Sequence, residues 1–281
     1  MASFSKLIRF ECEENDDVYF ADLGPHARAP PLPKTQLKAY RTIDGLVARN
    51  DAETVTIRRL LAPMPREGLP IYCVGLNYRS HAKEVNVDIP KYPPLWTKPA
   101  TSLAHPGEEI VMQNFCASSL PDYEGELVFV TSKECRDVSL EEAEDFILGY
   151  TVGNDLSCRK FQLHSQQAGQ FFFAKAFDKF APIGPMLLSP RLFANSTNLT
   201  ARVNGEVCQV ADFKNDMIFS PKEILSHMSQ GTTIPAGTIV MTGTPSGVGV
   251  FRKPKRFLSN GDFLEVEMPQ IGTLRNKIIF E

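Results

Sequence analysis

Short apolar runs of strand length dominate the chain from residue 71 onward, and they constrain the fold more than any other feature. Such runs, bounded by Gly, Pro, Asn or Asp, are typical of β-strands. The expected strands are IYCVGL (71–76), EIVM (109–112), YEGELVFV (123–130), ILGYTVGN (147–154), LTARV (199–203), EVCQV (206–210), GTIVMTG (237–243), FLEVEM (263–268) and TLRNKIIF (273–280). Helical patterns are fewer: SLEEAEDFI (139–147), a stretch after Ser157, and SPKEILSHMS (220–229) with Ser220 as its cap. The sequence therefore predicts a β-rich α+β protein with mixed sheets rather than a regular βαβ succession.

Two turn signals divide the chain further. Asn204-Gly205 joins two expected strands, and both residues tolerate the positive φ of a type I′ hairpin turn. Pro63, Pro65 and Pro70 break any helix just before the first long apolar run. We therefore expect a small N-terminal module with a linker at residues 1–65 and a larger domain at residues 66–281.

The composition excludes several classes of protein. A net charge of −3 and a pI near 6.0 leave no basic field to attract nucleic acid or an anionic membrane. No segment approaches about 18 uninterrupted apolar residues, and the first residues lack a signal-peptide pattern. The six cysteines form no CxxC pair, which favours reduced thiols over a disulfide frame or a zinc site. We expect a cytoplasmic protein without nucleic-acid or membrane partners, and a mitochondrial location stays open.

The stretch PDYEGELVFV (121–130) carries two acidic residues two positions apart in an apolar strand. Side chains alternate across a strand, so Glu124 and Glu126 are expected on the same face. Asp155 follows the next apolar strand and could join them. Three carboxylates would form a hard-oxygen site suited to Mg²⁺ or Mn²⁺. The alternative is that the two glutamates line a solvated edge and that Asp155 caps the helix that follows.

The segment VGLNYRSHAKEV (74–85) passes a glycine turn and begins a short helix with His81 and Glu84 at positions i and i+3. That spacing puts both side chains on one helix face within hydrogen-bonding reach. A carboxylate fixes the tautomer of the imidazole and raises its basicity, so the pair could take a proton near neutral pH. A solvated surface pair is the alternative.

Two lysines lie in unusual surroundings. Lys98 stands in PPLWTKPATSL (93–103), where prolines hold the backbone stiffly, and Lys175 stands among aromatic residues in FFFAKAFDKF (171–180). Either lysine could bind a substrate carboxylate or stabilise an enolate, and either could equally be a surface lysine with a buried stem. The loop TGTPSGVG (242–249) has three glycines and exposed amides that could hold an anion, or it could be a structural turn.

In order along the chain, these segments resemble the fumarylacetoacetate hydrolase family from about residue 60 to the C-terminus. The motifs are GLNYRSHAKE (75–84), KPATSL (98–103), DYEGELVFV (122–130), GYTVGNDLSCRKFQ (149–162), AKAFDKFAPIGP (174–185), RVNGEVCQ (202–209), DMIFSPKEILSHMS (216–229) and TGTPSGVG (242–249). The resemblance implies a mixed β-sandwich roll, often a homodimer, that acts on small keto acids with one Mg²⁺ or Mn²⁺ per subunit.

The resemblance also implies roles for individual residues. The metal ligands of the family fall on Glu124, Glu126 and Asp155, and its general-base dyad falls on His81 and Glu84, carried on a lid. Lys175 matches the lysine that stabilises negative charge. Further matches, at positions that contact substrate, are Lys98, Gln162 and Thr244.

The chain departs from the family pattern at two places. Lys160 stands where many relatives carry Asp, and AGQFFFAK (168–175) replaces the usual glycine-glycine-glutamine-tryptophan run. The short N-terminal module indicates the smaller-chain branch. We expect a metal-dependent hydrolase that cleaves a C–C bond in a 1,3-dicarbonyl keto acid of the acylpyruvate type. The alternatives are a decarboxylase of a β-keto acid such as oxaloacetate, a keto–enol isomerase or tautomerase, and a catalytically weak binding or scaffold relative.

Overall fold

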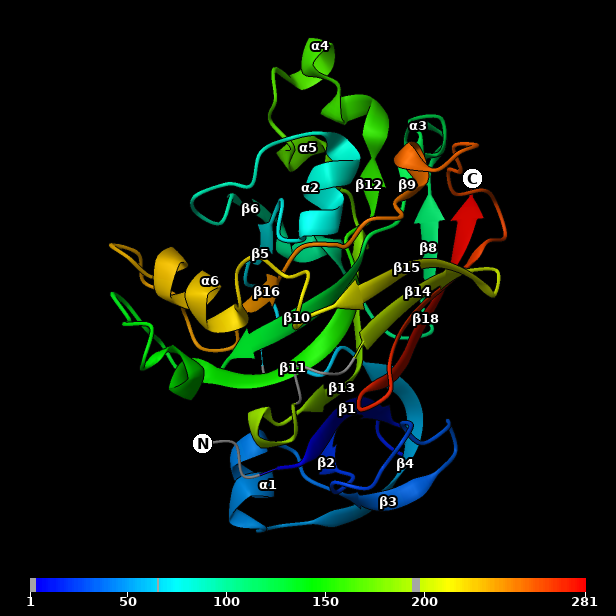
Figure 1. Cartoon of the computed structure of the whole chain (residues 1–281). Coiled ribbons are helices and arrows are strands. Elements are labelled where there is room, and N and C mark those ends of the chain that lie inside the picture. Colours follow the sequence, from blue (N-terminus) through cyan, green and yellow to red (C-terminus); the bar gives the residue numbers. More distant parts are fainter. Residues whose placement is uncertain (1–3, 65, 194–197) are drawn as a thin grey trace.

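Most of the secondary structure in the computed structural model is β-strand, organised in two main sheets (Figure 1). The structure describes residues 4–64, 66–193 and 198–281. Within them, an eleven-stranded sheet has the order β3-β4-β1-β13-β11-β10-β16-β5-β6, with β2 paired to β1 and β7 to β13. Its strands are β1 (Lys6–Cys12), β2 (Val18–Asp22), β3 (Gln36–Ala39), β4 (Glu53–Leu61), β5 (Ile71–Val74), β6 (Leu95–Lys98), β7 (Leu103–Ala104), β10 (Gly125–Thr131), β11 (Ile147–Asn154), β13 (Ala181–Leu188) and β16 (Ile239–Met241).

A second, five-stranded sheet has the order β15-β14-β17-β18-β8. Its strands are β8 (Glu109–Met112), β14 (Asn198–Val203), β15 (Glu206–Asp212), β17 (Phe263–Met268) and β18 (Gly272–Phe280). The expected hairpin joins β14 to β15, with Asn204 at φ 53° and Gly205 at φ 80°. Parallel pairs, such as β5 with β16 and β8 with β18, stand among antiparallel ones, so the prediction of a β-rich protein with mixed sheets is confirmed.

The helices are short in the described part of the chain. They are α1 (Ile43–Ala48), α2 (Arg79–Val85), α3 (Asn114–Ala117), α4 (His164–Gln167), α5 (Phe172–Lys175) and α6 (Pro221–Met228). At α6 the Ser220 side chain caps the helix, as the sequence predicted, and the structure shows that Glu223 completes a capping box. The helix expected at residues 139–147 is wrong: the segment forms a 3₁₀ turn, Ala143–Phe146, because Ile147 already pairs with Thr131 in the sheet.

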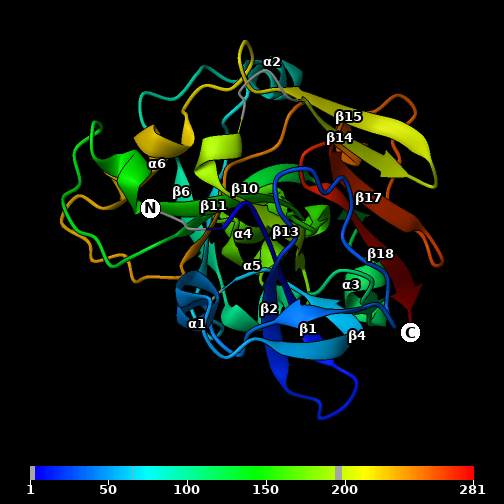
Figure 2. The same cartoon turned by 90° about the horizontal axis from the view of Figure 1, so that it is seen from below.

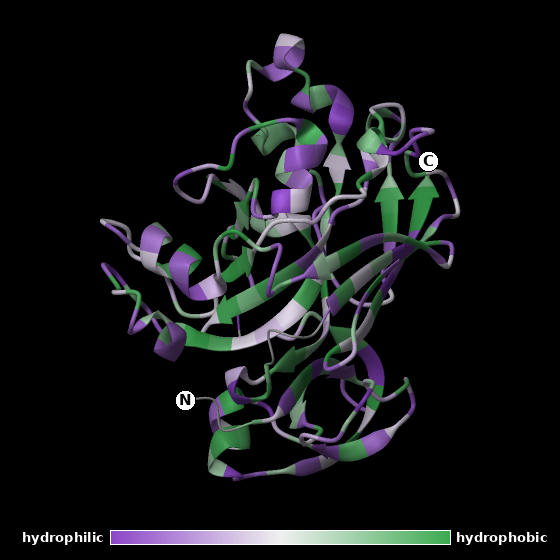
Figure 3. Cartoon of the chain, viewed as in Figure 1, coloured by the Kyte–Doolittle hydropathy of each residue, from purple (hydrophilic) through white to green (hydrophobic). Residues whose placement is uncertain are grey.

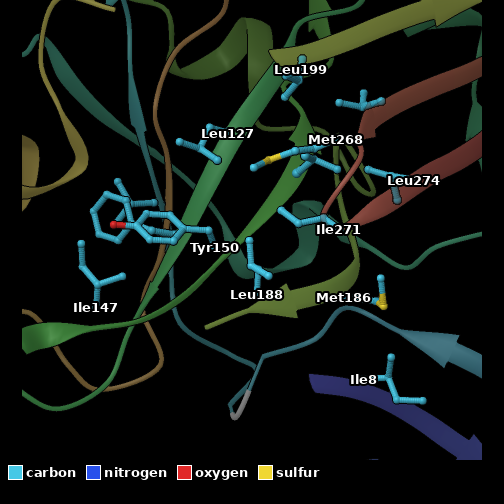
Figure 4. Close-up of a cluster of buried hydrophobic side chains, with 14 of the residues drawn as sticks. Ile8, Leu127, Ile147, Tyr150, Met186, Leu188, Leu199, Met268, Ile271 and Leu274 are labelled. Atoms are coloured by element: carbon cyan, nitrogen blue, oxygen red, sulfur yellow. The ribbon is translucent and has the colours of Figure 1, made fainter. Parts of the chain in front are cut away.

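The largest of three buried hydrophobic clusters includes the side chains that pack between the two sheets (Figure 4). Leu127, Tyr150 and Leu188 extend from the large sheet toward Leu199 and Leu274 of the five-stranded sheet, and all are buried. Hydropathy follows this arrangement: β8 and β10 are hydrophobic along most of their length, whereas α4 is largely hydrophilic (Figure 3). Face-to-face packing of two sheets is the sandwich arrangement expected from the sequence.

The N-terminal strands continue the large sheet instead of forming a separate one. β1 pairs with β13 through Lys6 and Leu7, and β2 and β4 flank β1 (Figure 2). Residue 65, the predicted boundary, lies outside the described residues, and the division there stays a prediction. Among the described residues no helix is long and apolar enough to cross a membrane. Helices α2, α4 and α5 gather at the opposite end of the molecule (Figure 1), and the site lies there.

Candidate active site

The strand that carries the two glutamates is interrupted, in contrast to the unbroken strand expected at residues 121–130. Strand β9 (Pro121–Asp122) pairs with β12 (Ser157–Cys158), and β10 starts only at Gly125. In the gap, side chains replace the ladder: Glu124 N donates to Asn154 Oδ1 at 2.9 Å, and Gly125 N donates to Gln209 Oε1 at 2.9 Å. Regular strand pairing is therefore interrupted at Tyr123 and Glu124, between β9 and β10.

Glu124, Glu126 and Asp155 meet in one buried cluster. The β10–β11 register pairs Gly125 with Asn154, and Asp155 N donates to Glu124 O at 2.8 Å in the next position. One carboxylate oxygen from each of the three residues lies within 4.8 Å of the others, and their exposed fractions are 5%, 1% and 0%. The solvated-edge interpretation is thereby excluded for both glutamates.

Two buried lysines neutralise this cluster. Lys175 Nζ, at the end of α5, lies 2.9 Å from Glu124 Oε2 and 2.5 Å from Asp155 Oδ2. Lys98 Nζ lies 2.5 Å from Asp155 Oδ1 and also donates to the carbonyls of Leu156 and Phe180. Neither lysine is the snorkelling surface residue that the sequence left open, because both are at most 2% exposed.

Sequence reasoning missed a third cation, Arg159, and its partner Asp122. Arg159 Nε donates to Asp122 Oδ2 at 2.7 Å, and Nη1 lies 2.6 Å from Glu124 Oε1. Nη1 also donates to Gln162 Oε1, whereas Nη2 is buried without a hydrogen-bond partner. The alternation Asp122, Glu124, Glu126 along the sequence was a signal that could have found Asp122.

The surroundings shift the pKa values of Glu124 and Glu126 in opposite directions. Burial raises the pKa of Glu124, but Lys175 and Arg159 outweigh it and lower the pKa to about 2. Burial, together with the negative charges of Asp155 and Glu124, raises the pKa of Glu126 well above its ordinary value. Burial lowers the pKa of Lys175, but Asp155 and Glu124 outweigh it and raise the pKa. Glu126 is thus the carboxyl that most needs additional positive charge to ionise.

The predicted His–Glu pair is formed on α2. His81 Nδ1 and Glu84 Oε2 are 2.7 Å apart, and Glu84 Oε1 accepts a hydrogen bond from Gly247 N at 2.9 Å. A carboxylate on Nδ1 leaves Nε2 as the basic nitrogen of the neutral imidazole. His81 lines the same cavity as Glu124, Arg159 and Lys175.

The backbone amides of the glycine loop at 242–249 and of the next residue, Val250, bind carboxyl groups, and these belong to side chains of the site itself. Gly243 N donates to Glu126 Oε2 at 2.7 Å, Gly247 N to Glu84, and Gly249 N and Val250 N to the two oxygens of Asp122. A Cβ at position 247 would lie 2.1 Å from the Cys208 carbonyl oxygen, and one at position 249 would lie 1.9 Å from that of Arg256. Only glycine allows this approach.

A cavity of about 720 Å³ opens onto these groups. Its charged end is formed by His81, Glu124, Arg159 and Lys175, with Gln162 beside them. The rest of the wall is largely apolar and comes from residues 75–96, 163–171 and 250–255. Residues 85–96 belong to the segment expected to form the lid.

The expected substrate contacts are placed differently from one another. Gln162 lines the cavity. Thr244 lies behind it, with its hydroxyl donating to Gly125 O at 3.0 Å and accepting from Gln209 Nε2 at 2.7 Å. Lys98 also lies behind the cavity wall, fully buried against Asp155. Substrate contact by these three residues stays a prediction.

The donor set fits a divalent cation. Three buried carboxylates converge within 4.8 Å, and no histidine or cysteine belongs to this cluster of the described residues. Carboxylate oxygens alone suit hard cations such as Mg²⁺, Mn²⁺ or Ca²⁺ better than zinc.

The fold and the site together define a class: a β-sandwich protein in which a buried acidic cluster and a His–Glu pair each contribute a side chain, Glu124 and His81, to one cavity. The family model for the C-terminal domain of fumarylacetoacetate (FAA) hydrolase matches residues 70–279. The chain therefore belongs to the fumarylacetoacetate hydrolase family, as its motifs predicted.

Similar proteins carry names for different reactions. A caffeoylpyruvate hydrolase of Neonothopanus nambi is 36% identical over 99% of this chain and 94% of its own length. An oxaloacetate tautomerase of Bacillus subtilis is 40% identical over 78% of this chain and 73% of its own. The solved structure of a 5-carboxymethyl-2-hydroxymuconate delta-isomerase from Mycobacterium smegmatis has a TM-score of 0.77 at 29% identity, covering 98% of this chain and 99% of that one. The family is shown, and the names span hydrolysis, tautomerisation and isomerisation.

Proposed function

We propose that the chain is a hydrolase that cleaves the bond between the methylene carbon C3 and the distal acyl carbonyl carbon of an acylpyruvate-type keto acid, releasing pyruvate and a carboxylic acid. The observation that carries the proposal is the shared cavity, where the His81–Glu84 base faces Glu124, Arg159 and Lys175. Hydrolysis needs a base for water, a place for negative charge and a cavity for the acyl group, and the site offers all three. The caffeoylpyruvate hydrolase among the relatives supports this reaction.

The base is His81. With Glu84 on Nδ1, its Nε2 takes a proton from water as the oxygen adds to the distal acyl carbonyl carbon. The hydrogen bond from Gly247 N to Glu84 fixes the carboxylate and so orients the imidazole. Without this support the ring would lose its tautomer and direction.

The leaving group departs as the enolate of pyruvate. As the C–C bond breaks, its electron pair moves to C3 and onto the keto oxygen, and C3 then takes up a proton. Lys175 supplies a buried ammonium, and Arg159 supplies the unpaired Nη2 donor beside it for the keto-acid oxygens. A divalent cation held by Glu124, Glu126 and Asp155, which we propose to be Mg²⁺ or Mn²⁺, would supply Lewis-acid polarisation of the same oxygens.

A second reaction, keto–enol tautomerisation of a β-keto acid such as oxaloacetate, has the support of relatives named for it. His81 would then move a proton between carbon and oxygen without activating water. Decarboxylation of the same acid needs only enolate stabilisation by the same groups. The charges of the site serve all three reactions, because each passes through an enolate.

Product analysis separates them. Purified protein with Mg²⁺ or Mn²⁺ would be supplied with acetylpyruvate and with oxaloacetate, and the products followed by chromatography and ultraviolet absorbance. Acetate and pyruvate in equal amounts are expected from acetylpyruvate. The hydrolase assignment would be contradicted if acetylpyruvate stayed intact while oxaloacetate either released CO₂ or changed only its enol absorbance. Glu126→Gln is expected to lose turnover, and full turnover in that variant would refute the assigned cluster.

The homodimer expected from the sequence remains part of this proposal. An aromatic surface patch supports it: Phe115 and Phe173 are 54% and 41% exposed and contact one another edge to face. Large exposed aromatic patches are typical of interaction surfaces. Analytical ultracentrifugation is expected to give twice the 31.3 kDa chain mass, and a monomer at micromolar concentration would contradict it.

A further inference from the structure

The apolar part of the cavity has a composition that the reaction itself does not require. We call it the outer wall and define it by the seven apolar side chains Val85, Val87, Leu95, Trp96, Leu163, Phe171 and Phe251. Five of them are large hydrophobic residues left 36–55% exposed. Apolar surface that is collected in one concave place and open to water gains free energy when a ligand covers it.

The aromatic side chains of the outer wall are arranged for a flat group. The Trp96 and Phe171 rings are 6.2 Å apart at an interplanar angle of 83°, so one presents an edge to the other. The Trp96 ring also lies 5.1 Å from Lys175 Nζ, which joins the outer wall directly to the charged end. A ligand anchored at Lys175 therefore extends along Trp96.

The cavity is larger than a small keto acid needs. Its volume of about 720 Å³ falls within the ~300–1,000 Å³ range of pockets that bury drug-sized ligands. A four-carbon dicarboxylate would occupy the charged end and leave the outer wall in water. If its second carboxylate reached the outer wall, that carboxylate would find few cations. Among the described lining residues beyond the charged end, the one cation is the exposed Lys255.

We propose that the outer wall binds the acyl group of the substrate and selects a large, flat, apolar group of the aryl or arylalkenyl type. This inference rests on the proposed hydrolase function and deepens it by naming the acyl class. Trp96 belongs to this wall and also lies beside Lys175, so one residue contacts both parts of the cavity. Trp96 and Phe171 are thus specificity-determining residues.

The kinetic test compares benzoylpyruvate, heptanoylpyruvate and acetylpyruvate. Benzoylpyruvate is expected to have a kcat/KM at least about tenfold above that of acetylpyruvate, and Phe171→Ala is expected to reduce this ratio about three- to tenfold. Phe172→Ala is the matched control, because Phe172 is the next residue, is 48% exposed and does not line the cavity. It is expected to leave the ratio unchanged. A ratio near one in the unmodified protein, or a preference for heptanoylpyruvate over benzoylpyruvate, would overturn the inference.

A binding test avoids turnover altogether. The chain has one tryptophan, so its indole fluorescence reports on the outer wall alone. 4-Phenyl-2-oxobutanoate lacks the second carbonyl group and cannot be cleaved, and 2-oxobutanoate is its control without the ring. In the presence of Mg²⁺ we expect the phenyl compound to change Trp96 fluorescence with a Kd at least about tenfold lower than that of the control. Equal Kd values would contradict the proposed acyl site.

The two tests also separate this inference from the proposed function. If acetylpyruvate and benzoylpyruvate are cleaved equally well, the proposed hydrolase function is supported and the proposed selectivity for the acyl group is refuted. If neither is cleaved while oxaloacetate is turned over, the hydrolase falls and the inference as stated falls with it. The fluorescence titration then decides whether the outer wall binds a ring in another substrate.

Discussion

The charged end and the outer wall share one cavity but are built in opposite ways. At the charged end nearly every polar atom is buried and held by a named partner, as in the contacts of Lys175 with Glu124 and Asp155. Along the outer wall the side chains are half-exposed, and residues such as Leu163 and Val87 stand open to water. The first region fixes charges at definite positions, and the second offers surface that a ligand can complete.

Under the two proposals above, the charged end carries out the reaction and the outer wall selects the substrate. Removing a charge from the first region leaves its partners buried and unpaired, which costs several kcal/mol. Truncating a half-exposed apolar side chain in the second region costs little without ligand. The following variants test the contrast in order of decreasing effect.

Asp155→Asn is expected to have the largest effect. It leaves Lys98 and Lys175 without their shared carboxylate charge, so we expect a loss of about 3–5 kcal/mol of stability and no measurable turnover. The rise in Tm that Mn²⁺ gives the unmodified protein is also expected to vanish, since a ligand that binds only the folded state stabilises it. Differential scanning fluorimetry with and without Mn²⁺ measures the loss of stability and the metal-dependent rise in Tm. The exposed Asp178→Asn is the control. Absence of a metal shift in the unmodified protein would favour the scaffold alternative.

His81→Ala is expected to lower kcat about 10²- to 10⁴-fold through loss of the general base. Its Tm shift with Mn²⁺ should persist, because the imidazole pairs with Glu84 and not with the acidic cluster. Steady-state kinetics with the fluorimetric assay measures the two effects separately. The exposed His164→Ala serves as control, and a kcat for His81→Ala within threefold of the unmodified value would exclude the dyad as the base.

Glu126→Gln is expected to stabilise the metal-free protein above about pH 5, by a few degrees in Tm at about 2–4 °C per kcal/mol. The pKa of Glu126 is raised in the folded state, mainly by burial. Below the ordinary value of 4.5 both folded and unfolded chains hold the proton, so the variant changes nothing there. As the pH rises, the unfolded chain releases the proton first, and the unmodified protein loses stability that the glutamine variant retains.

With Mn²⁺ present we expect the Glu126→Gln variant to melt below the unmodified protein, because the variant lacks one metal ligand. Melting curves from pH 4 to pH 8 in chelator and in Mn²⁺ test both signs. The exposed Glu109→Gln is the control, because its ion pair with Lys277 spans 3.7 Å at the surface. A variant that melts below the unmodified protein in chelator at pH 8 would show that Glu126 is ionised without metal.

Leu163→Ala is expected to have the smallest effect, with a change in the free energy of unfolding within about 0.5 kcal/mol. Leu163 is 55% exposed on the outer wall. The fully buried Leu127→Ala is the matched comparison and should cost about 2–5 kcal/mol. Urea denaturation of both variants measures the difference. Equal losses would show that the outer wall is packed like the core.

Local signals in the sequence predicted nine of the strands, the hairpin turn and the members of the acidic cluster, whereas strand β13 was not predicted. The spacing of Glu124 and Glu126 indicated convergence, and the His81–Glu84 spacing indicated a bonded pair; both geometries are present. Each of these signals spans only a few residues, so periodicity alone could reveal it.

Long-range features were not readable in the same way. The break at Glu124 depends on side chains from Asn154 and Gln209, which only the folded sheets bring near. The role of Arg159 was not readable for the same reason, because its partner Asp122 lies on β9, 37 residues earlier in the chain. Phe171 and Phe173 look alike in sequence, yet Phe171 lines the cavity and Phe173 packs against Phe161.

The loop at 242–250 ties together groups that act in different ways. Its peptide groups support Glu84 of the base, Glu126 of the acidic cluster and Asp122, which holds Arg159. A displacement of this one segment would change the positions of all three carboxyl groups at once, so their positions depend on one another. All seven side chains of the outer wall come from other segments, although Phe251 directly follows the loop. Substitutions in the outer wall can therefore accumulate one at a time in related chains, whereas the three carboxyl groups held by the loop keep their positions only together.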